Sequence, residues 1–244
     1  MGEDILHAAQ AGADGMGRIY AIGDIHGRLD LLERAIEAVA RDVADNGPAA
    51  LTVTLGDYVD RGPASFGVIE RLLANPFPTP YVALKGNHEQ LFERFMTEPE
   101  IFDDWRRGGA LETLNSYRVP VADVMMGRHY DVAAEALAQA LPATHREFFA
   151  GLKTSHETDR YFFCHAGVRP GIPLARQSDD DLMWIRHEFL SSAVDFGKIV
   201  VHGHTPVDAP EVRANRLNID TGAYATGRLT CIALDDAGHR FLKV

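Results

Sequence analysis

Five short turns carry polar side chains that could bind a metal ion or transfer a proton. They read GDIHG at residues 23–27, GDYVDRG at 56–62, GNHE at 86–89, HAG at 165–167 and HGHTP at 202–206. Together they offer carboxylate, amide and imidazole groups from Asp24, His26, Asp57, Asn87, His165 and His204. Such a mixed oxygen and nitrogen set suits one or two divalent ions of borderline softness.

A single turn of this kind is most often structural, because Gly-Asp and Gly-Asn are common turn chemistry at the ends of strands. Five of them along one chain are improbable by chance. A carboxylate on a central strand, such as Asp57, can bridge two metal ions. Two ions about 3.5–4 Å apart are the usual device for activating water against a phosphate ester. The pattern therefore indicates metal-assisted hydrolysis.

The elements that must position the first three turns alternate between strand and helix patterns. Strand-like runs at residues 18–22, 51–55 and 81–84 each lead directly into one of these turns. Between them lie two helical patterns, with apolar faces at Leu29, Leu32, Ile36, Val39 and Val43, and at Phe66, Ile69, Leu72 and Leu73. This order predicts a βαβαβ unit, and ligands bind beyond the carboxyl ends of parallel strands. We therefore expect the three turns to meet at one crevice.

The rest of the chain changes from helical to strand-rich. Residues from about 91 to 157 are mostly helical in pattern and predict an inserted helical region beside the site. The WRRGG segment at 105–109 within it is either a substrate-contacting lip or a helix end. Strand-like runs follow at 161–164, 198–201, 216–220 and 229–234. Because no linker interrupts the sequence, we expect a single domain over residues 18–244, preceded by an N-terminal arm at 1–17.

Composition excludes several classes of protein. The 244 residues are 46% hydrophobic and 24% charged, which argues against disorder and coiled coils. With 24 Lys and Arg against 35 Asp and Glu, the net charge is −11, so no nucleic acid and no anionic membrane is an expected partner. Two cysteines, Cys164 and Cys231, cannot form a disulfide framework. Without a basic, apolar N-terminal segment, a cytoplasmic protein is expected.

The first three turns resemble the signature blocks GDxHG, GDxVDRG and GNHE of the phosphoprotein phosphatase (PPP) family of calcineurin-like metallophosphoesterases. The later HAG and GHTP turns follow in that family's order, so the resemblance covers about residues 18–234. The compact serine/threonine phosphatases of bacteria and bacteriophages are the most similar members. The resemblance implies an α/β fold in which two mixed sheets are flanked by helices, an αββα sandwich.

The resemblance also implies a role for each matching residue. It implies a first metal ion on Asp24, His26 and Asp57, and a second on Asp57, Asn87, His165 and His204, with Asp57 bridging. It implies a hydroxide between the ions as nucleophile, His88 as general acid oriented by Asp60, and Asn87, Arg61 and Arg186 as the phosphate-binding residues. Arg186 rests on the short match Trp-Ile-Arg at 184–186. The expected metal is Mn²⁺, although Fe and Zn²⁺ suit the same ligands.

Other polar residues have simpler explanations. His202, two residues before His204, is expected to be structural. The acidic run at 179–181 is expected to begin a helix, where the helix dipole stabilises it. Cys164 is expected to be buried in a strand. Tyr224 lies in the closing segment and is either a residue that approaches the substrate or a structural one.

Three functions compete. A metal-dependent serine/threonine protein phosphatase is favoured, because GDYVDRG and GNHE match the protein phosphatase blocks letter by letter. The alternative is a symmetrical bis(5'-nucleosyl)-tetraphosphatase, since those enzymes share HAG and the RGP-x-S sequence found at 61–65 but typically lack Asp60 and Glu89. A binding protein without turnover is least favoured, because every expected ligand and the acid are present.

Overall fold

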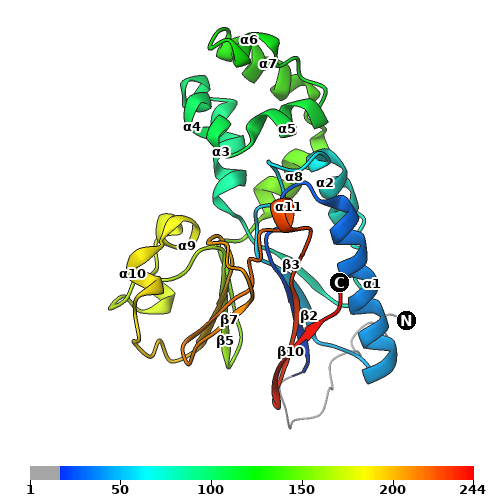
Figure 1. Cartoon of the computed structure of the whole chain (residues 1–244), viewed down its shortest axis with the longest axis vertical. Helices are drawn as coiled ribbons and strands as arrows, with labels where there is room; N and C mark the ends of the chain where they lie inside the picture. Colours follow the sequence, from blue (N-terminus) through cyan, green and yellow to red (C-terminus); the bar gives the residue numbers. More distant parts are fainter. Residues whose placement is uncertain (1–16) are drawn as a thin grey trace, which may run out of the picture.

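The computed structural model describes residues 17–244, and the N-terminal arm expected at 1–17 lies outside the described residues except for Gly17. The chain forms two five-stranded sheets that face each other, with helices on both outer faces and a group of helices beyond one end of the sheets (Figure 1). This arrangement confirms the αββα sandwich, with two mixed sheets, that the sequence predicts.

The first sheet has the strand order β10-β9-β1-β2-β3. Its strands are β1 (Ile19–Ile22), β2 (Leu51–Thr54), β3 (Tyr81–Ala83), β9 (Cys231–Asp235) and β10 (Gly238–Leu242). β1, β2 and β3 run parallel, while β9 is antiparallel to β1 and to β10. Since β1, β2 and β3 are parallel neighbours, their carboxyl ends open onto the same edge of the sheet.

The second sheet has the order β4-β5-β6-β8-β7. Its strands are β4 (Ser155–Glu157), β5 (Tyr161–Cys164), β6 (Ile199–His202), β7 (Glu211–Val212) and β8 (Arg216–Asn218). β5, β6 and β8 run parallel, and the two edge strands are antiparallel to their neighbours. The sequence had not indicated β4, β7 or β10. β4 also shortens the expected helical region, whose last helix ends at Gly151.

Successive side chains along a strand point to opposite faces of its sheet. This alternation builds three packed layers: one between the sheets and one between each sheet and its outer helices. In β1, Ile19 and Ala21 face the second sheet, where Phe163 and Val201 complete the core between the sheets. The intervening side chains of β1 pack instead against the outer helices α1 (Leu29–Asn46) and α2 (Ser65–Leu73). The outer face of the second sheet is covered by α9 (Asp179–Trp184) and α10 (His187–Leu190). As expected, the acidic run begins α9, where Ser178 caps the helix by accepting a hydrogen bond from the Asp181 N–H.

The inserted helices form the part of the molecule drawn above the sandwich in Figure 1. They are α3 (Asn87–Phe95), α4 (Phe102–Arg107), α5 (Ala110–Ser116), α6 (Ala122–Met125), α7 (Tyr130–Ala140) and α8 (Ala143–Gly151), with the short 3-10 helix η1 (Pro99–Ile101); a second one, η2 (Leu174–Arg176), precedes α9. Buried His145 joins α8 to the sandwich, with Nδ1 2.8 Å from the Tyr117 hydroxyl and Nε2 2.7 Å from Glu70 Oε1 of α2. The insertion is therefore packed onto the α2 side of the site.

The layer between the sheets provides a test of the packing. Phe163→Ala removes a fully buried ring from this layer and should lower the free energy of unfolding by about 3–5 kcal/mol, from lost burial and a residual cavity. Phe241→Ala, which removes a ring that is 45% exposed on edge strand β10, should cost about 1 kcal/mol or less. Urea unfolding followed by circular dichroism measures both; equal losses would contradict the assigned layer.

Candidate metal centre

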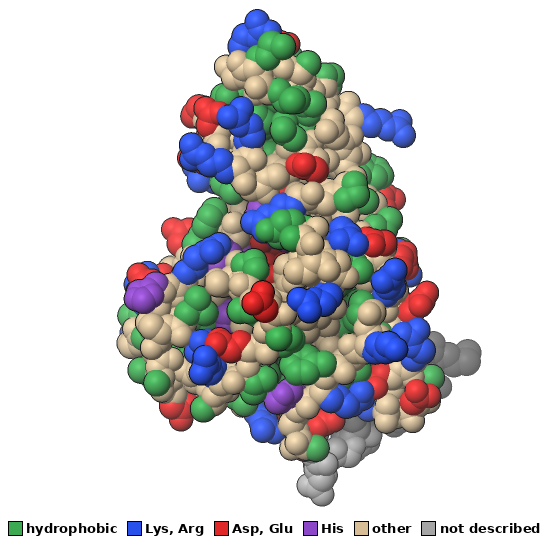
Figure 2. Space-filling view, viewed as in Figure 1, with side chains coloured by type: hydrophobic (Ala, Val, Ile, Leu, Met, Phe, Trp, Pro, Cys, Tyr) green, Lys and Arg blue, Asp and Glu red, His purple; other side chains and the backbone are tan. Residues whose placement is uncertain are grey.

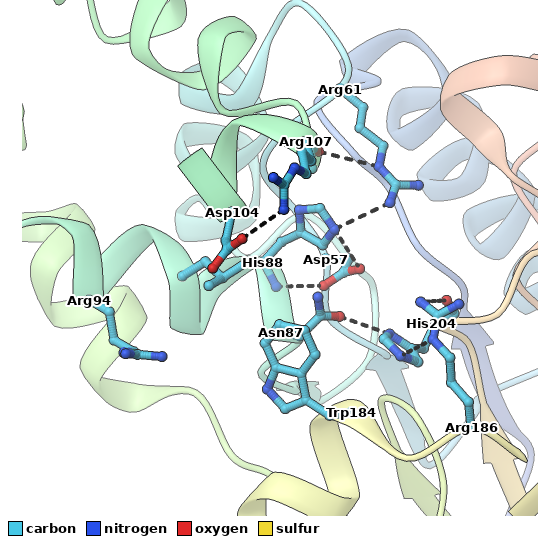
Figure 3. A pocket seen from close by; sticks show the side chains of 12 residues that line it. Asp57, Arg61, Asn87, His88, Arg94, Asp104, Arg107, Trp184, Arg186 and His204 are labelled. Atoms are coloured by element: carbon cyan, nitrogen blue, oxygen red, sulfur yellow. Dashed lines mark hydrogen bonds and ion pairs between the residues drawn. The ribbon is translucent and has the colours of Figure 1, made fainter. Parts of the chain in front are cut away.

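The polar turns meet where the carboxyl ends of the parallel strands of both sheets come together. Asp24 and His26 follow β1, and Asp57 follows β2. Asn87 and His88 begin α3, directly after β3. The second sheet adds His165 after β5 and His204 after β6. All of these residues are at most 5% exposed, so the structure brings the predicted ligands together in one buried cluster. Figure 3 shows Asp57, Asn87, His88 and His204 of this cluster.

Asp57 lies at the middle of this cluster. Its Oδ2 is 3.5 Å from His26 Nε2, and its Oδ1 is 3.3 Å from His165 Nε2. Two groups of possible ligand atoms, each within 4.8 Å of one another, therefore share this carboxylate: one includes His26 and His88, and the other includes His165 and His204. A shared carboxylate between two ligand groups is the geometry that a pair of ions requires.

Asn87 completes the second group. Its Oδ1 is 2.9 Å from His165 Nε2 and 2.8 Å from His204 Nδ1, and these two nitrogens are 3.2 Å apart. An amide oxygen and two imidazole nitrogens that point at a common centre are suitable ligands for Mn²⁺, Fe or Zn²⁺.

Backbone carbonyls fix two of the histidine rings. His26 Nδ1 is 2.9 Å from the Val59 carbonyl oxygen, and His165 Nδ1 is 2.9 Å from that of Leu55. Because a carbonyl oxygen only accepts hydrogen bonds, both Nδ1 atoms carry hydrogen and both Nε2 atoms are free for a metal ion. Metal-binding histidines usually have this kind of support.

Asp24 fits a metal ligand for a different reason. Its Oδ2 accepts a hydrogen bond from the His204 N–H (3.0 Å), but its Oδ1 is buried without any hydrogen-bond partner. A Cβ at Gly203 would lie 2.0 Å from that oxygen, so only glycine leaves room for it. A buried, unpaired carboxylate oxygen costs free energy unless a cation satisfies it.

The pKa shifts show how much negative charge the cluster holds. Burial, followed by the charge of Asp220, raises the pKa of Asp24 well above its ordinary value. Burial alone would lower the pKa of His165, but the charges of Asp57 and Asp24 outweigh it and raise this pKa to about 10. Burial and nearby His88 lower the pKa of His26 to about 3. The negative charge of the cluster therefore favours a bound positive charge. Divalent ions supply this charge when they displace the proton of His165.

His88 and Asp60 form a hydrogen-bonded pair beside the cluster. His88 Nδ1 is 2.6 Å from Asp60 Oδ2, which leaves His88 Nε2 directed toward Asp57 at 3.8 Å. Asp60 is held in turn by the Trp105 indole N–H (2.7 Å) and the Thr113 hydroxyl (2.6 Å). Burial opposes protonation of His88, but Asp57 and the Asp60 hydrogen bond outweigh it and raise its pKa. A histidine held in this way can donate a proton from Nε2.

Glu89 connects the second and third turns. Its buried carboxylate accepts hydrogen bonds from the N–H groups of Asp57 (2.8 Å), Tyr58 (2.7 Å) and Gly86 (2.9 Å). Asp57 itself has a left-handed backbone (φ 51°), which is unfavourable for a residue with a side chain. The carboxylate of Glu89 therefore stabilises the turn that presents Asp57.

Several other site residues share this unfavourable backbone conformation. Besides Asp57, positive φ angles occur at His26 (46°), Asp60 (72°), Arg61 (67°) and His204 (66°). Each such residue costs of order 1–3 kcal/mol and persists where surrounding structure holds it, most often at functional sites. The fold thus maintains local strain in order to present these side chains.

Four arginines line the adjoining cavity, which has a volume of about 470 Å³, and two of them, Arg61 and Arg186, lie beside the cluster. Arg61 Nη2 is 3.5 Å from His88 Nε2, and its guanidinium lies 4.4 Å from the centre of the Tyr224 ring. Arg186 Nε is 3.0 Å from His204 Nε2. The two cations therefore flank the cluster, in positions where they could neutralise a bound phosphate (Figure 3).

The residues that the sequence set aside have other surroundings. His202 is buried against Phe189, with ring centres 5.0 Å apart, on the outer face of the second sheet. Cys164 is buried in the same layer, where burial raises its pKa. Tyr224, in α11 (Ala223–Thr226), lies beside the cluster, with its ring centre 5.4 Å from that of His26.

Sequence reasoning missed the residues that support the site. Trp105 and Thr113 hold Asp60, and Glu89 holds the Asp57 turn. The WRRGG segment is thus both a helix end and part of the site: Gly108 lies so close to His88 that an added Cβ would be 3.0 Å from His88 Cε1. The one sign of this supporting role in the sequence was the tryptophan that precedes the two glycines of the WRRGG segment.

Comparison with known proteins agrees with this geometry. The chain is 25% identical over 225 residues to serine/threonine-protein phosphatase 2 of Escherichia coli (87% of this chain, 90% of that protein). It is 26% identical over 234 residues to the asymmetrical bis(5'-nucleosyl)-tetraphosphatase PrpE of Halalkalibacterium halodurans (86% and 87%). A solved structure described as a proposed diadenosine tetraphosphatase has the same fold, with 20% identity, a TM-score of 0.62 and coverage of 93% and 94%.

The match to a family model decides the wider assignment. The model described as calcineurin-like phosphoesterase matches residues 17–229, nearly the whole chain. Within residues 17–244, no helix has the length and apolar character needed to cross a membrane. Since the fold, the clustered ligands and the family model agree, the chain belongs to the calcineurin-like phosphoesterase family.

Proposed function

We propose that this metallophosphoesterase is a serine/threonine protein phosphatase. The observation that carries the proposal is the buried His88–Asp60 pair at 2.6 Å, held by Trp105 and Thr113 beside the metal-ligand cluster. The alkoxide that leaves phosphoserine or phosphothreonine has a high pKa, so its departure requires a proton donor. A positioned imidazole meets that requirement.

The proposed metal ligands lie on the two sides of Asp57. His26 and Asp57 would hold one ion together with Asp24, whose Oδ1 has no other partner, while His88 of that group is kept as the proton donor. Asp57, His165 and His204 would hold the other ion together with Asn87, with Mn²⁺ as the proposed metal. When bound, two divalent ions supply a nucleophile derived from water and neutralise charge on the phosphate oxygens. The protein contributes the fixed geometry: carbonyl-anchored imidazoles and a carboxylate held by a left-handed turn.

The other proposed roles belong to side chains at the cavity. Arg61 and Arg186 would bind the phosphate oxygens from two sides, with Asn87 between them, and so orient phosphorus for in-line attack. His88 would give its Nε2 proton to the leaving oxygen, while Asp60 stabilises the positive ring and keeps Nε2 in place. Against the opposing effect of burial, Asp57 and the Asp60 hydrogen bond raise the pKa of His88, which favours the protonated ring that this role requires.

An asymmetrical dinucleoside tetraphosphatase is the second candidate, because relatives with that name match most of the chain. These relatives are asymmetrical tetraphosphatases, whereas the sequence motifs suggest the symmetrical enzymes. Cleavage of a phosphoanhydride releases a nucleotide phosphate, a leaving group with a low pKa that needs little protonation. The His88–Asp60 pair would then have little to do, and this favours the monoester substrate.

Substrate preference can be measured directly. The Mn²⁺-loaded protein should hydrolyse a phosphothreonine peptide with a kcat/KM at least about tenfold above that for diadenosine tetraphosphate, about 1.4 kcal/mol of transition-state binding. Both substrates are compared in one preparation by phosphate release and by chromatography of nucleotides. The reverse preference would refute the protein phosphatase and support the tetraphosphatase.

The acid role of His88 predicts a dependence on the leaving group. His88→Asn should lower kcat/KM for an alkyl phosphate by about 10²-fold or more, but for p-nitrophenyl phosphate by about tenfold or less, because nitrophenolate leaves without a proton. Asp60→Asn should show the same difference more weakly. The exposed His187, changed to Asn, is the matched control and should show none. Equal losses on both esters would argue against proton donation.

The bridging position of Asp57 predicts loss of metal. Asp57→Asn removes the charge that both ligand groups share, so the purified variant should retain less than one of two equivalents of Mn²⁺, and its rate should fall to background. Elemental analysis after dialysis gives the metal content, and circular dichroism checks folding. A folded variant with two tightly bound ions would disprove the bridge.

A further inference from the structure

The cavity continues beyond the cluster, along the inserted helices. Its outer part is lined by Leu91 and Arg94 of α3, by Arg107 of α4 with its ion-pair partner Asp104, and by Trp184 of α9 (Figure 3). Cavities of about 300–1,000 Å³ enclose whole small ligands, so the 470 Å³ here exceed what one phosphate group occupies. The outer part has no role in the proposed hydrolysis.

One face of α3 connects the two parts of the cavity. Asn87, Leu91 and Arg94 are spaced i, i+4 and i+7, which places them on the same helix face. With a rise of 1.5 Å per residue, the Arg94 Cα lies about 10 Å along the axis from that of Asn87. This row of three side chains, called the stripe below, thus leads from the phosphate position at Asn87 to the Arg94 guanidinium at the outer end.

Arg107 approaches from the general-acid side. It directly precedes Gly108, the residue that touches the His88 ring. In Figure 3 its side chain lies above His88, between Arg61 and the outer cavity. An anion beyond the leaving group would therefore meet Arg107 first.

The present partners of these two arginines hold them weakly. Arg94 Nη2 is 2.6 Å from Glu98 Oε2, and Arg107 Nη1 is 2.9 Å from Asp104 Oδ1. The Arg107–Asp104 pair lies within α4, whereas Glu98 lies beyond the end of α3, and both pairs are exposed. Figure 2 shows both basic and acidic side chains on this edge of the insertion. Exposed ion pairs between residues three or four positions apart contribute little to stability. Either arginine can therefore turn to a substrate anion at little cost.

Trp184 forms the wall opposite this stripe. Its indole N–H donates to Gln90 Oε1 (2.6 Å), which fixes the ring next to α3, and the side chain remains 39% exposed. Together with Leu91 it offers an apolar surface between the phosphate position and Arg94. Such a surface suits the uncharged part of an extended chain.

We propose that the outer cavity binds an acidic residue of the substrate protein. Phosphorylated sites that have Asp or Glu within about three residues are then preferred. An extended chain advances about 3.3 Å per residue, and the 10 Å stripe therefore corresponds to about three residues from the phosphorylated one. With a net charge of −11, the protein attracts acidic segments only where arginines gather locally. This inference rests on the proposed protein phosphatase activity.

Peptides of one length test the preference. Each contains one phosphothreonine, flanked on both sides by three residues of Glu, Gln or Lys. The wild-type protein should show kcat/KM in the order Glu, Gln, Lys, with Glu over Gln by about tenfold at low salt and less at high salt. Arg94→Ala combined with Arg107→Ala should reduce that ratio to about twofold or less. The rate on p-nitrophenyl phosphate normalises each variant for metal loading.

Arg106→Ala is the matched control, because Arg106 lies on the same helix beside Arg107 but does not line the cavity. It should keep the wild-type ratio, whereas Arg94→Glu with Arg107→Glu should favour the Lys peptide. Equal rates on Glu and Gln peptides, or an unchanged ratio in the double alanine variant, would overturn the acidic subsite alone. Hydrolysis of diadenosine tetraphosphate but of no peptide would overturn the proposed function, and the peptide subsite with it.

Discussion

The site depends on the hydrogen bonds by which the Glu89 carboxylate holds the turn after β2. Asp57 must occupy a left-handed backbone conformation to point its carboxylate between the two histidine groups. By itself this conformation is unfavourable, and three backbone N–H groups directed at one buried carboxylate offset the cost. Since Glu89 and Asn87 share the first turn of α3, the same contact fixes the amide ligand. Loss of this carboxylate would disturb both ligand groups at once.

The sandwich explains why ligands far apart in the sequence meet. Each sheet has three parallel strands whose carboxyl ends face one edge, and packing the sheets face to face brings those edges together. Asp57 from the first sheet thereby comes within 3.3 Å of His165 from the second. The core between the sheets, rather than any local contact, sets this distance. Precision at the metal centre is thus a consequence of how residues such as Phe163 and Val201 pack.

Strong local signals made most of this site predictable. The turns have fixed residue types at fixed spacing, and the parallel strands before them show clear apolar runs, so the meeting point followed from sheet geometry. The edge strands β4, β7 and β10 lack such a pattern, because none of their residues is fully buried and so few of them need to be apolar. Trp105 and Thr113 could not be assigned either. Their contact with Asp60 depends on how α4 and α5 fold back over the second turn, which no local pattern encodes.

The same dependence on the insertion bears on substrate choice. Relatives named as protein phosphatases and as dinucleoside tetraphosphatases match this chain about equally well, so the sandwich and its ligands are compatible with either chemistry. What separates them must lie in the groups that meet the leaving group and the rest of the substrate. Here those groups come largely from the insertion: Trp105 and Thr113 support the His88–Asp60 pair, the proposed proton donor, and Arg107 borders it. A proton donor at that position is useful for an alkoxide and of little use for a phosphoanhydride. The insertion, rather than the metal centre, therefore carries the information that favours a phosphoprotein.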